Sequence, residues 1–300
     1  MVVGSPLNAE GARAHFPSVL DGKNCRIDLS RPRIMGILNV TPDSFSDGGC
    51  YLATQAALAH ALSMQQQGAD IIDIGGESTR PGAKPVTAQE EIDRVLPVIE
   101  RLATEIDLPL SIDTSKSTVA KAAVAAGAAF VNDISGLSFD PMMGRVVAES
   151  GAGLFLMHTS DRPERMQQKT SYQDVVAEVV ASLRRSLEQA VSWGIDVGKL
   201  AVDPGIGFGK DLSGNLELLR RLDAVAELGR PVLLGTSRKS FIGKVLAQPD
   251  PEQRLAGTLA TVALAVARGG RLFRVHDVAP ARDAARMAFA VCRGAGWQPA

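Results

Sequence analysis

The sequence has few cysteines, few aromatic residues and no long run of apolar or like-charged residues. Its three cysteines, Cys25, Cys50 and Cys292, are widely spaced and odd in number. This spacing fits neither a disulfide framework nor a cysteine-based zinc site, so we expect reduced thiols. The longest apolar run, residues 259–267 interrupted only by Thr261, is far shorter than a membrane span. These absences argue against a disulfide scaffold, a zinc cage and a transmembrane protein.

Charge is balanced, and the first residues carry no secretion signal. The sequence has 32 Lys and Arg residues against 33 Asp and Glu residues, with no basic block or tail. A nucleic-acid or membrane-surface partner requires an electrostatic footprint, so we expect neither partner. The chain does not begin with basic residues followed by an apolar core, so we expect a cytoplasmic protein.

Short segments rich in Val, Ile and Leu alternate along the chain with helix-like stretches. They predict buried strands at residues 33–39, 70–75, 109–113, 128–133, 153–158, 199–203, 231–235 and 272–276. Strands that alternate with helices and are apolar on both faces indicate a parallel sheet covered by helices. Eight units of about 30 residues each predict an α/β protein with a (β/α)8 TIM barrel.

A doubly wound open sheet is the alternative fold. That fold usually has a Gly-rich turn after its first strand, whereas the first strand here ends in Asn39-Val-Thr-Pro-Asp43. No linker-like stretch divides the chain, so we expect a single domain. It would consist of an N-terminal extension at residues 1–32, covering the base of the barrel, and a barrel at residues 33–294.

Three short motifs predict where helices begin. Thr87 and Glu90 have the spacing of a capping box, in which each side chain satisfies a backbone N–H of the other residue. Asp140-Pro141 and Asp250-Pro251 each place a capping residue before a proline at the first helical position. We therefore expect a helix to start directly after each of these capping residues.

Polar residues follow the predicted strands at their carboxyl ends, where the active site of a barrel is built. They are Asn39, Glu77 to Arg80, Asp113, Asn132, Asp133, His158, Asp203, Thr236 to Ser240 and Arg274 to Asp277. A lone polar residue at a strand end commonly caps the next helix. Eight such ends at one rim instead indicate a binding site.

The rim combines two kinds of chemistry. Carboxylate and amide groups, which suit a flat heterocycle with several N–H donors, come from Asp113, Asn132 and Asp203. Cations or donors, which suit an anionic group such as a phosphate, come from Arg80, Lys239, Arg274 and His276. We expect a ligand or pair of ligands with one heterocyclic part and one anionic part.

The Gly-rich segment at residues 203–210, DPGIGFGK, fits no nucleotide-binding motif. A Walker loop requires Gly where Pro204 stands and Ser or Thr where Asp211 stands, and the dinucleotide fingerprint requires Gly at Lys210. We predict a mobile loop whose glycines let the backbone approach a ligand, with Phe208 as an apolar wall.

A family resemblance is carried by the segments MGILNVTPDSFSDGG, DIGGESTRPGA, SIDTSK, VNDISG, LFLMH, DPGIGFGK, GTSRKSFIG and FRVHDV, in this order. Over residues 33–278 the chain resembles dihydropteroate synthase. The resemblance implies a TIM barrel, usually a homodimer, and a transferase of folate biosynthesis. These enzymes join 6-hydroxymethyl-7,8-dihydropterin pyrophosphate to 4-aminobenzoate and release pyrophosphate with the help of Mg2+. Sulfonamides compete with 4-aminobenzoate in this family.

The resemblance also implies roles for single residues. It assigns the pterin to Asp113, Asn132, Ile134, Met157, Asp203, Lys239 and Arg274. It assigns the pyrophosphate to Asn39, Thr79, Arg80, Arg274 and His276, and Mg2+ to Asn39. The 4-aminobenzoate would meet Phe45, Thr79, Arg80, Pro81, Phe208 and Ser240. The catalytic set would be Asn39, Asp47, Lys239, Arg274 and His276.

The segment at residues 35–49 changes at Asn39 from an apolar strand to a polar, Gly-containing loop. Loss of pyrophosphate from the pterin would leave a cation that reacts with water, so the site needs shielding. We predict that Asn39 faces the leaving group and that the loop with Phe45 and Asp47 closes over bound pyrophosphate as a lid. Asp47 would then contact Mg2+ or the incoming amine.

Two alternative functions are a pterin-binding methyltransferase and a non-catalytic pterin-binding barrel. Such methyltransferases share the Asp/Asn/Asp pterin floor but need no pyrophosphate site, so the basic segments at residues 237–240 and 274–277 favour a synthase. A non-catalytic paralogue is expected to have lost Lys239, Arg274 or the Asn39 loop, and all three are present.

Residues 255–267 predict a helix that is apolar almost all round. A helix on the outside of a barrel normally keeps one polar face in water. We therefore expect a second subunit to cover the outer face of this helix.

Overall fold

The computed structural model describes residues 17–40, 49–80 and 82–298. Its parallel strands are β3 (Arg33–Asn39), β4 (Ile71–Gly75), β5 (Leu110–Asp113), β6 (Phe130–Asp133), β7 (Gly153–Met157), β8 (Leu200–Asp203), β9 (Leu233–Leu234) and β10 (Leu272–Val275). They lie in the order β8-β7-β6-β5-β4-β3-β10-β9. A bridge between Val202 and Val232 joins β8 to the segment that leads into β9 and closes the ring. The predicted (β/α)8 barrel is confirmed, and the open sheet is excluded.

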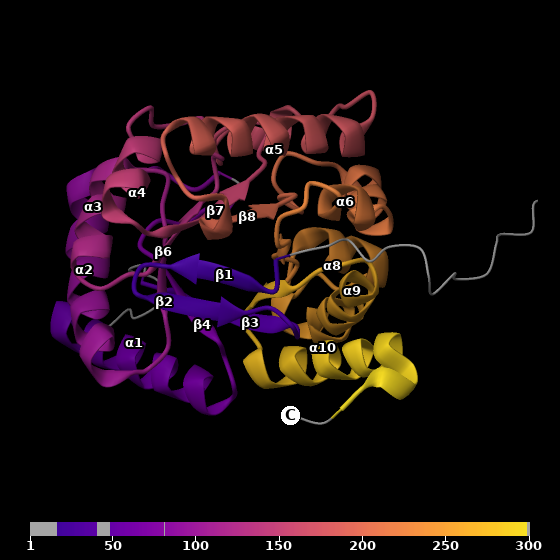
Figure 1. Cartoon of the computed structure of the whole chain (residues 1–300), viewed down its shortest axis with the longest axis horizontal. Coiled ribbons are helices and arrows are strands. Elements are labelled where there is room, and N and C mark those ends of the chain that lie inside the picture. The colour runs from indigo at the N-terminus through magenta and orange to yellow at the C-terminus, as the bar shows by residue number, and fades with distance from the viewer. Residues whose placement is uncertain (1–16, 41–48, 81, 299–300) are drawn as a thin grey trace, which may run out of the picture.

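Helices surround the strands on the outside (Figure 1). They are α1 (Gly49–Gln66), α2 (Ala88–Glu105), α3 (Ser117–Ala125), α4 (Met143–Ser150), α5 (Val175–Ser192), α6 (Leu212–Arg220), α7 (Leu222–Ala226), α8 (Ser240–Leu246), α9 (Leu255–Ala267) and α10 (Val278–Arg293). Short 3-10 turns occur at η2 (Met166–Gln168), η3 (Val197–Lys199), η4 (Pro251–Arg254) and η5 (Gly294–Gly296). Within the described residues, none of the helices has the length and hydrophobicity needed to cross a membrane.

Two of the three predicted caps are found as expected. The capping box at α2 is formed by Thr87 and Glu90, each accepting from the backbone N–H of the other. Asp250 caps η4, a 3-10 turn that runs into α9, with Pro251 at its first position. The helix start predicted after Asp140 is wrong: a turn at residues 141–142 comes first and α4 begins at Met143, although Asp140 accepts from the Met142 N–H as a capping residue does, and its other oxygen accepts from the Ser117 N–H.

Side chains alternate along each strand between the helix layer and the barrel interior, as the pleat of a strand requires. In β4, Ile72 and Ile74 pack in the cluster beneath the helices, whereas Ile71 packs in a separate cluster inside the barrel. Asp73 and Gly75 share the inward side with Ile71. The same alternation turns the polar ends of the other strands toward the barrel axis.

A two-stranded hairpin covers the amino ends of the barrel strands, crossing the face that is nearest the viewer in Figure 1. It comprises β1 (Val19–Gly22) and β2 (Cys25–Asp28), which pair antiparallel. Its buried side chains pack with the inner cluster, which consists of Leu20, Ile27, Leu29, Met35, Ile71, Ala129, Phe130, Phe155, Ala201, Leu233 and Leu272. A side chain at Gly22 would come within 2.6 Å of the Phe130 ring, so only glycine allows this approach. The hairpin therefore closes the apolar end of the barrel.

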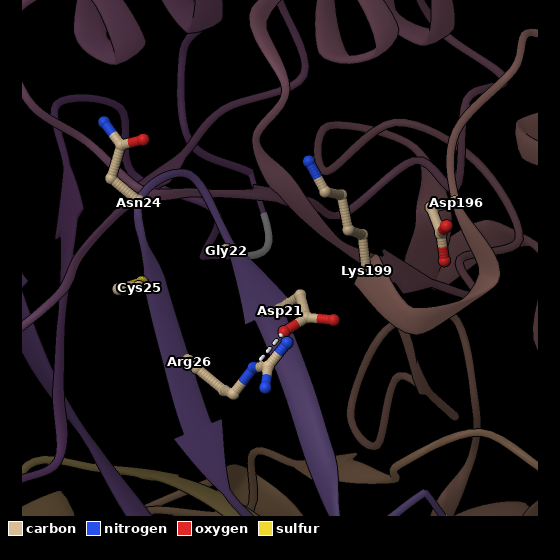
Figure 2. Close-up of a pocket in the computed structure, with 7 residues that line it drawn as sticks. All are labelled: Asp21, Gly22, Asn24, Cys25, Arg26, Asp196 and Lys199. Atoms are coloured by element: carbon tan, nitrogen blue, oxygen red, sulfur yellow. Dashed lines mark hydrogen bonds and ion pairs between the residues drawn. The ribbon is translucent and has the colours of Figure 1, made fainter.

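An open hollow of about 580 Å³ lies beside this hairpin, on the face opposite the strand carboxyl ends. Figure 2 shows its lining, which is Asp21, Gly22, Asn24, Cys25, Arg26, Asp196 and Lys199. Its charges satisfy one another or the backbone: Arg26 pairs with Asp21 at 2.8 Å, and Lys199 donates to the Gly151 carbonyl at 2.6 Å. The hollow is a seam between the hairpin and η3, far from the polar strand ends.

The hairpin should contribute strongly to stability. Leu20 is 0% exposed inside the barrel, whereas Leu216 on α6 is 43% exposed. We expect Leu20→Ala to lower the free energy of unfolding by about 2–5 kcal/mol, because it leaves a cavity in a packed cluster. Leu216→Ala should change it by less than about 1 kcal/mol. Urea unfolding of both variants tests this; equal effects would show that the hairpin is not part of the core.

Candidate active site at the strand carboxyl ends

Four neighbouring strands bring their polar ends to the same level. Asn39 is in register with Gly75, Gly75 with Asp113, and Asp113 with Asn132. The absence of a side chain at Gly75 leaves room between its neighbours: a Cβ there would lie 3.6 Å from the Asp113 Cβ and 3.9 Å from the Asn39 Oδ1. Asn39 therefore lies beside the buried polar groups, at the exposed end of β3.

Arg274 forms an ion pair with two buried carboxylates. Its Nη2 donates to Asp113 Oδ2 at 2.7 Å, and its Nε donates to Asp73 Oδ2 at 2.6 Å. Asp113 was predicted at the site from its position at a strand end, but Asp73 was not predicted. Its signal in the sequence is a single carboxylate in the apolar segment Ile71-Ile-Asp-Ile-Gly75, where an inward-facing residue is expected to be apolar.

The environment of Asp113 shifts its acidity strongly. Burial raises the pKa of this carboxyl to about 7; the nearby charge of Asp73 adds to the rise, and the Arg274 guanidinium opposes it. Its Oδ1 has no hydrogen-bond partner within the described chain. Asp113 therefore offers one acceptor oxygen that no protein group uses.

Asn132 and Asp203 lie with Asp113 in a layer of buried hydrogen-bond acceptors, here termed the acceptor floor. Asn132 donates from Nδ2 to Asp73 Oδ2 at 2.9 Å. Asp203 accepts from the Gly205 N–H at 2.7 Å, and burial raises its pKa although Lys239 opposes the rise. Ile134 and Met157, the predicted apolar walls, are both buried. Their placement agrees with the predicted pterin pocket but does not test it.

The Gly-rich loop after β8 differs from the prediction. Its glycines Gly205, Gly207 and Gly209 have φ values of 67°, 85° and 62°, which are accessible mainly to glycine. A side chain at Gly205 would collide with the His158 carbonyl oxygen, so this glycine permits packing against the loop after β7 rather than approach by a ligand. The Lys210 ammonium lies beneath the loop and donates to the carbonyls of Gly205 and Phe208 at 2.8 and 2.9 Å.

Lys239 and Phe208 lie together at the mouth of the barrel. The Lys239 Nζ is 4.5 Å from the centre of the Phe208 ring and donates to the Ile206 carbonyl. Burial lowers the pKa of Lys239 to about 8; Arg274 lowers it further, and Asp203 opposes the shift. The neighbouring Arg238 turns away from the barrel and pairs with Asp277 at 2.7 Å. Of the two adjacent cations, only Lys239 is directed to the site.

The environment of His276 determines whether its ring can offer a positive charge to a phosphate. Its Nδ1 lies 2.9 Å from the Ser237 Oγ. Burial, together with the charges of Arg274 and Arg238, lowers its pKa to about 4. The ring is therefore neutral at pH 7 and contributes a hydrogen-bond donor rather than a positive charge.

The loop after β4 is held at its base by a buried charge cluster. Lys116 pairs with Glu77 at 2.6 Å and with Glu91 at 2.5 Å, and Glu91 is 0% exposed. Glu77 also accepts from the Val86 N–H at 3.0 Å, which joins the two ends of the loop. Thr79 is half-buried and Arg80 is exposed on this loop. Within the described part of the chain, neither residue forms a hydrogen bond or ion pair with another predicted site residue.

The remaining predicted site residues are either exposed or lie outside the described part of the chain. Ser240, the first residue of α8, is exposed. Phe45, Asp47 and Pro81 lie outside the described residues, so the predicted lid is not tested. The part of the chain that the structure describes contains no group of three or more His, Cys, Asp or Glu side chains that could hold a metal.

Comparison with known proteins identifies the family. Residues 35–276 match the model of the family described as "Pterin binding enzyme". The dihydropteroate synthase of Bacillus subtilis is 51% identical over 255 residues, which are 85% of this chain and 86% of that protein. The chain belongs to the dihydropteroate synthase family. It is a transferase of folate biosynthesis, and the alternatives of a methyltransferase and a non-catalytic barrel are set aside.

Solved structures of the family share the fold closely. The dihydropteroate synthase of Xanthomonas albilineans with 4-aminobenzoic acid superposes with a TM-score of 0.86 at 48% identity, covering 91% of this chain and 98% of that one. The synthase of Yersinia pestis in a complex with a sulfonamide drug has a TM-score of 0.86 at 43% identity, covering 92% and 100%.

The raised pKa of Asp113 predicts a pH dependence of stability. Because its folded-state pKa of about 7 exceeds the ordinary value of 3.8, protonation stabilises the folded state below pH 4 and this contribution is lost as pH rises to 7. Wild type should therefore lose stability relative to Asp113→Asn between pH 4 and 7, by at most about 1.4 kcal/mol per pH unit. Urea unfolding of both proteins across this range measures the difference; a constant difference would contradict the shift.

Proposed function

We propose that the acceptor floor of the barrel binds the dihydropterin ring of 6-hydroxymethyl-7,8-dihydropterin pyrophosphate. Asp113, Asn132 and Asp203 would accept hydrogen bonds from the N–H groups of the pterin, with Ile134 and Met157 packing on the ring. The observation that carries this assignment is the unpartnered Oδ1 of buried Asp113. A buried acceptor without a partner is costly, so a ligand that donates to it gains binding free energy.

The pyrophosphate would lie at the cationic side of the same pocket. Arg274 donates from Nε and Nη2 to protein carboxylates, and its Nη1 makes no hydrogen bond within the described chain. The anion would lie at the strand ends, surrounded by Arg274, His276, Asn39, Thr79 and Arg80. Lys239 would hydrogen-bond the pterin nearby. Preorganised donors at the leaving group supply the main electrostatic stabilisation when its negative charge develops.

Asn39 would hold Mg2+ through its side-chain oxygen. Asn39 offers an exposed amide oxygen at the end of β3, and the described residues contain no group of three or more His, Cys, Asp or Glu side chains that could hold a metal, which fits an ion that keeps most of its waters and binds chiefly to substrate phosphates. When bound, the ion would neutralise part of the charge on the departing pyrophosphate.

4-Aminobenzoate would bind above the pterin, between Phe208 and the loop with Thr79 and Arg80. The Phe208 ring is half-buried at the mouth of the barrel, and the hydroxyl of the exposed Ser240 would donate to the carboxylate of the substrate. Phe45 and Pro81 belong to this assignment although they lie outside the described residues. The synthase of Xanthomonas albilineans was solved with 4-aminobenzoic acid and that of Yersinia pestis in a complex with a sulfonamide drug, which supports 4-aminobenzoate as a substrate and sulfonamides as ligands of this chain.

The reaction would proceed by loss of pyrophosphate from the exocyclic carbon of the pterin and attack by the arylamine nitrogen. The carbon–oxygen bond breaks, and the positive charge left on carbon is delocalised into the ring held by Asp113, Asn132 and Asp203. The nitrogen–carbon bond then forms, and the amine loses one proton. An arylamine is neutral at pH 7, so no strong general base is required.

A second copy of the chain would cover the apolar face of α9 and α10. Leu264 on α9 is 61% exposed, and Met287 and Val291 on α10 are 64% and 69% exposed. Met287 and Val291 line an apolar groove of about 360 Å³ between the two helices, to which α9 contributes Ala263 and Ala267. Exposed apolar patches of this kind are typical of subunit interfaces, which supports the predicted homodimer.

Product formation tests the proposed reaction. Purified protein is mixed with the dihydropterin pyrophosphate, 4-aminobenzoate and Mg2+, and 7,8-dihydropteroate is measured by mass. We expect chelation of Mg2+ to suppress the product, and Lys239→Ala to lower the catalytic efficiency by about 10- to 100-fold through loss of a charged donor. Lys244→Ala, on the exposed side of α8, is the matched control and should remain fully active. Retained pterin binding without product would favour the non-catalytic barrel.

Sedimentation tests the proposed dimer. Leu264→Glu places a charge in the apolar face of α9, and it should convert the protein to a monomer at micromolar concentration because a buried unpaired charge is costly. Val197→Glu, at a position 43% exposed in η3, is the control and should leave the dimer intact. A wild-type protein that sediments only as a monomer would contradict the assignment.

A further inference from the structure

Asp73 is a buried carboxylate to which the proposed substrate contacts give no role. It lies in the middle of β4, faces the barrel interior and is 0% exposed. It stands in register with Ile37 on one side and Ser111 on the other, below the level of Asp113. A carboxylate in this position is costly unless it is paired, and its cost points to a specific use.

One oxygen of Asp73 contacts two residues assigned to different parts of the same substrate. Its Oδ2 accepts from Asn132 Nδ2 at 2.9 Å and from Arg274 Nε at 2.6 Å. Asn132 is assigned to the pterin, and Arg274 is assigned to both the pterin and the pyrophosphate. Asp73 is thus the protein group that joins the two halves of the proposed site.

The contact with Asn132 fixes the direction of its amide. A carboxylate has only acceptors, so the nitrogen of Asn132 must face Asp73 and its oxygen must face the pocket. At this position the Asn132 oxygen therefore offers an acceptor to an N–H donor of the pterin. A neutral amide at position 73 could rotate and donate a hydrogen bond. The Asn132 oxygen could then face residue 73, and the Asn132 nitrogen would face the ligand.

The contact with Arg274 fixes the plane of its guanidinium. Nε is held by Asp73 and Nη2 by Asp113, which leaves Nη1 free of protein partners in the described structure. Asp73 is in register with Ser111, two residues before Asp113 on β5, so its contact with Nε is separate from the Asp113 contact and can persist when a ligand displaces Asp113 from Nη2. Asp73 therefore anchors Arg274 while its outer nitrogens change partners.

We propose that Asp73 is a positioning residue that aligns Asn132 and Arg274 for recognition of the pterin and its pyrophosphate group. The inference rests on the proposed assignment of the pterin pocket, and it adds a residue that touches neither substrate.

The test compares Asp73→Asn, which keeps the shape of the side chain, with the swapped variant Asp73→Asn/Asn132→Asp. In the swapped variant the amide at position 73 can donate to the carboxylate at position 132, which again presents an acceptor to the pocket. The control is Asp70→Asn, at the base of the same strand, where Asp70 pairs with Arg33 at 2.9 Å and accepts from the Ile34 N–H at 2.8 Å.

Equilibrium titration with 6-hydroxymethyl-7,8-dihydropterin pyrophosphate gives the Kd of each variant without requiring turnover. We expect Asp73→Asn to raise this Kd by about 10- to 100-fold, the effect of losing one charged hydrogen bond. The Michaelis constant for the arylamine substrate should change by less than about threefold, within the usual context dependence of neighbouring sites. The swapped variant should bind more tightly than Asp73→Asn, and Asp70→Asn should bind as wild type does.

Three results would overturn the proposal. They are an unchanged Kd in Asp73→Asn, an equal rise in the pterin Kd and in the Michaelis constant for the arylamine, and a swapped variant that binds no better than Asp73→Asn. If Asp73→Asn fails to fold, the swapped variant still decides, because it retains an amide–carboxylate pair in the barrel. If the proposed function itself is wrong, the wild-type protein will neither bind the pterin nor form product. This result distinguishes failure of the proposed function from failure of the Asp73 proposal.

Discussion

The site depends on one guanidinium that serves two buried carboxylates. Arg274 pairs with Asp73 and Asp113 inside a barrel that excludes water, where an unpaired charge of either sign would be strongly destabilising. Burial raises the pKa of Asp113 to about 7, and the charge of Asp73 adds to the rise because one cation serves two anions. The same pairing leaves Nη1 without a partner in the described chain. Removing Arg274 would therefore leave two buried carboxylates unpaired, so stability and substrate recognition are coupled here.

The two ends of the barrel have opposite physical characters, and each supports the other. At the amino end, Leu20 and Ile27 of the hairpin pack on Phe130 and Phe155 and seal the interior from water. Toward the carboxyl end, the side chains that face the barrel interior change from apolar to polar. In β4, Ile71 and Asp73 are successive inward-facing residues; the first is apolar and the second is a carboxylate. The apolar seal lowers the local dielectric beneath the polar layer, which strengthens its electrostatic interactions and shifts its pKa values.

Much of this arrangement was predictable because strand periodicity and strand ends are local features of the sequence. The barrel, its strand positions and the inward direction of Asp113, Asn132 and Asp203 follow from such patterns. Asp73 was missed because it lies in mid-strand, where its purpose depends on Arg274, 201 residues away. The neutrality of His276 depends on tertiary burial in the same way. The opposite directions of Arg238 and Lys239 arise from a left-handed backbone at Arg238, with φ 57°, which the local sequence does not indicate.

On the proposed assignment, the pairing of Arg274 with Asp113 makes the two halves of the substrate depend on each other. A pterin that takes Oδ2 of Asp113 as well as the unpartnered Oδ1 leaves the Arg274 Nη2 without its partner, and an anion that takes Nη2 as well as Nη1 leaves Asp113 without its cation. Either the pterin or the pyrophosphate alone would therefore break the ion pair between Arg274 and Asp113 and leave one of these residues without a partner. A single molecule that carries both a pterin and a pyrophosphate replaces both partners at once, so the site favours the activated pterin over either fragment. After pyrophosphate has left, the Arg274 guanidinium and the pterin product compete for Asp113, and re-formation of the protein ion pair favours product release.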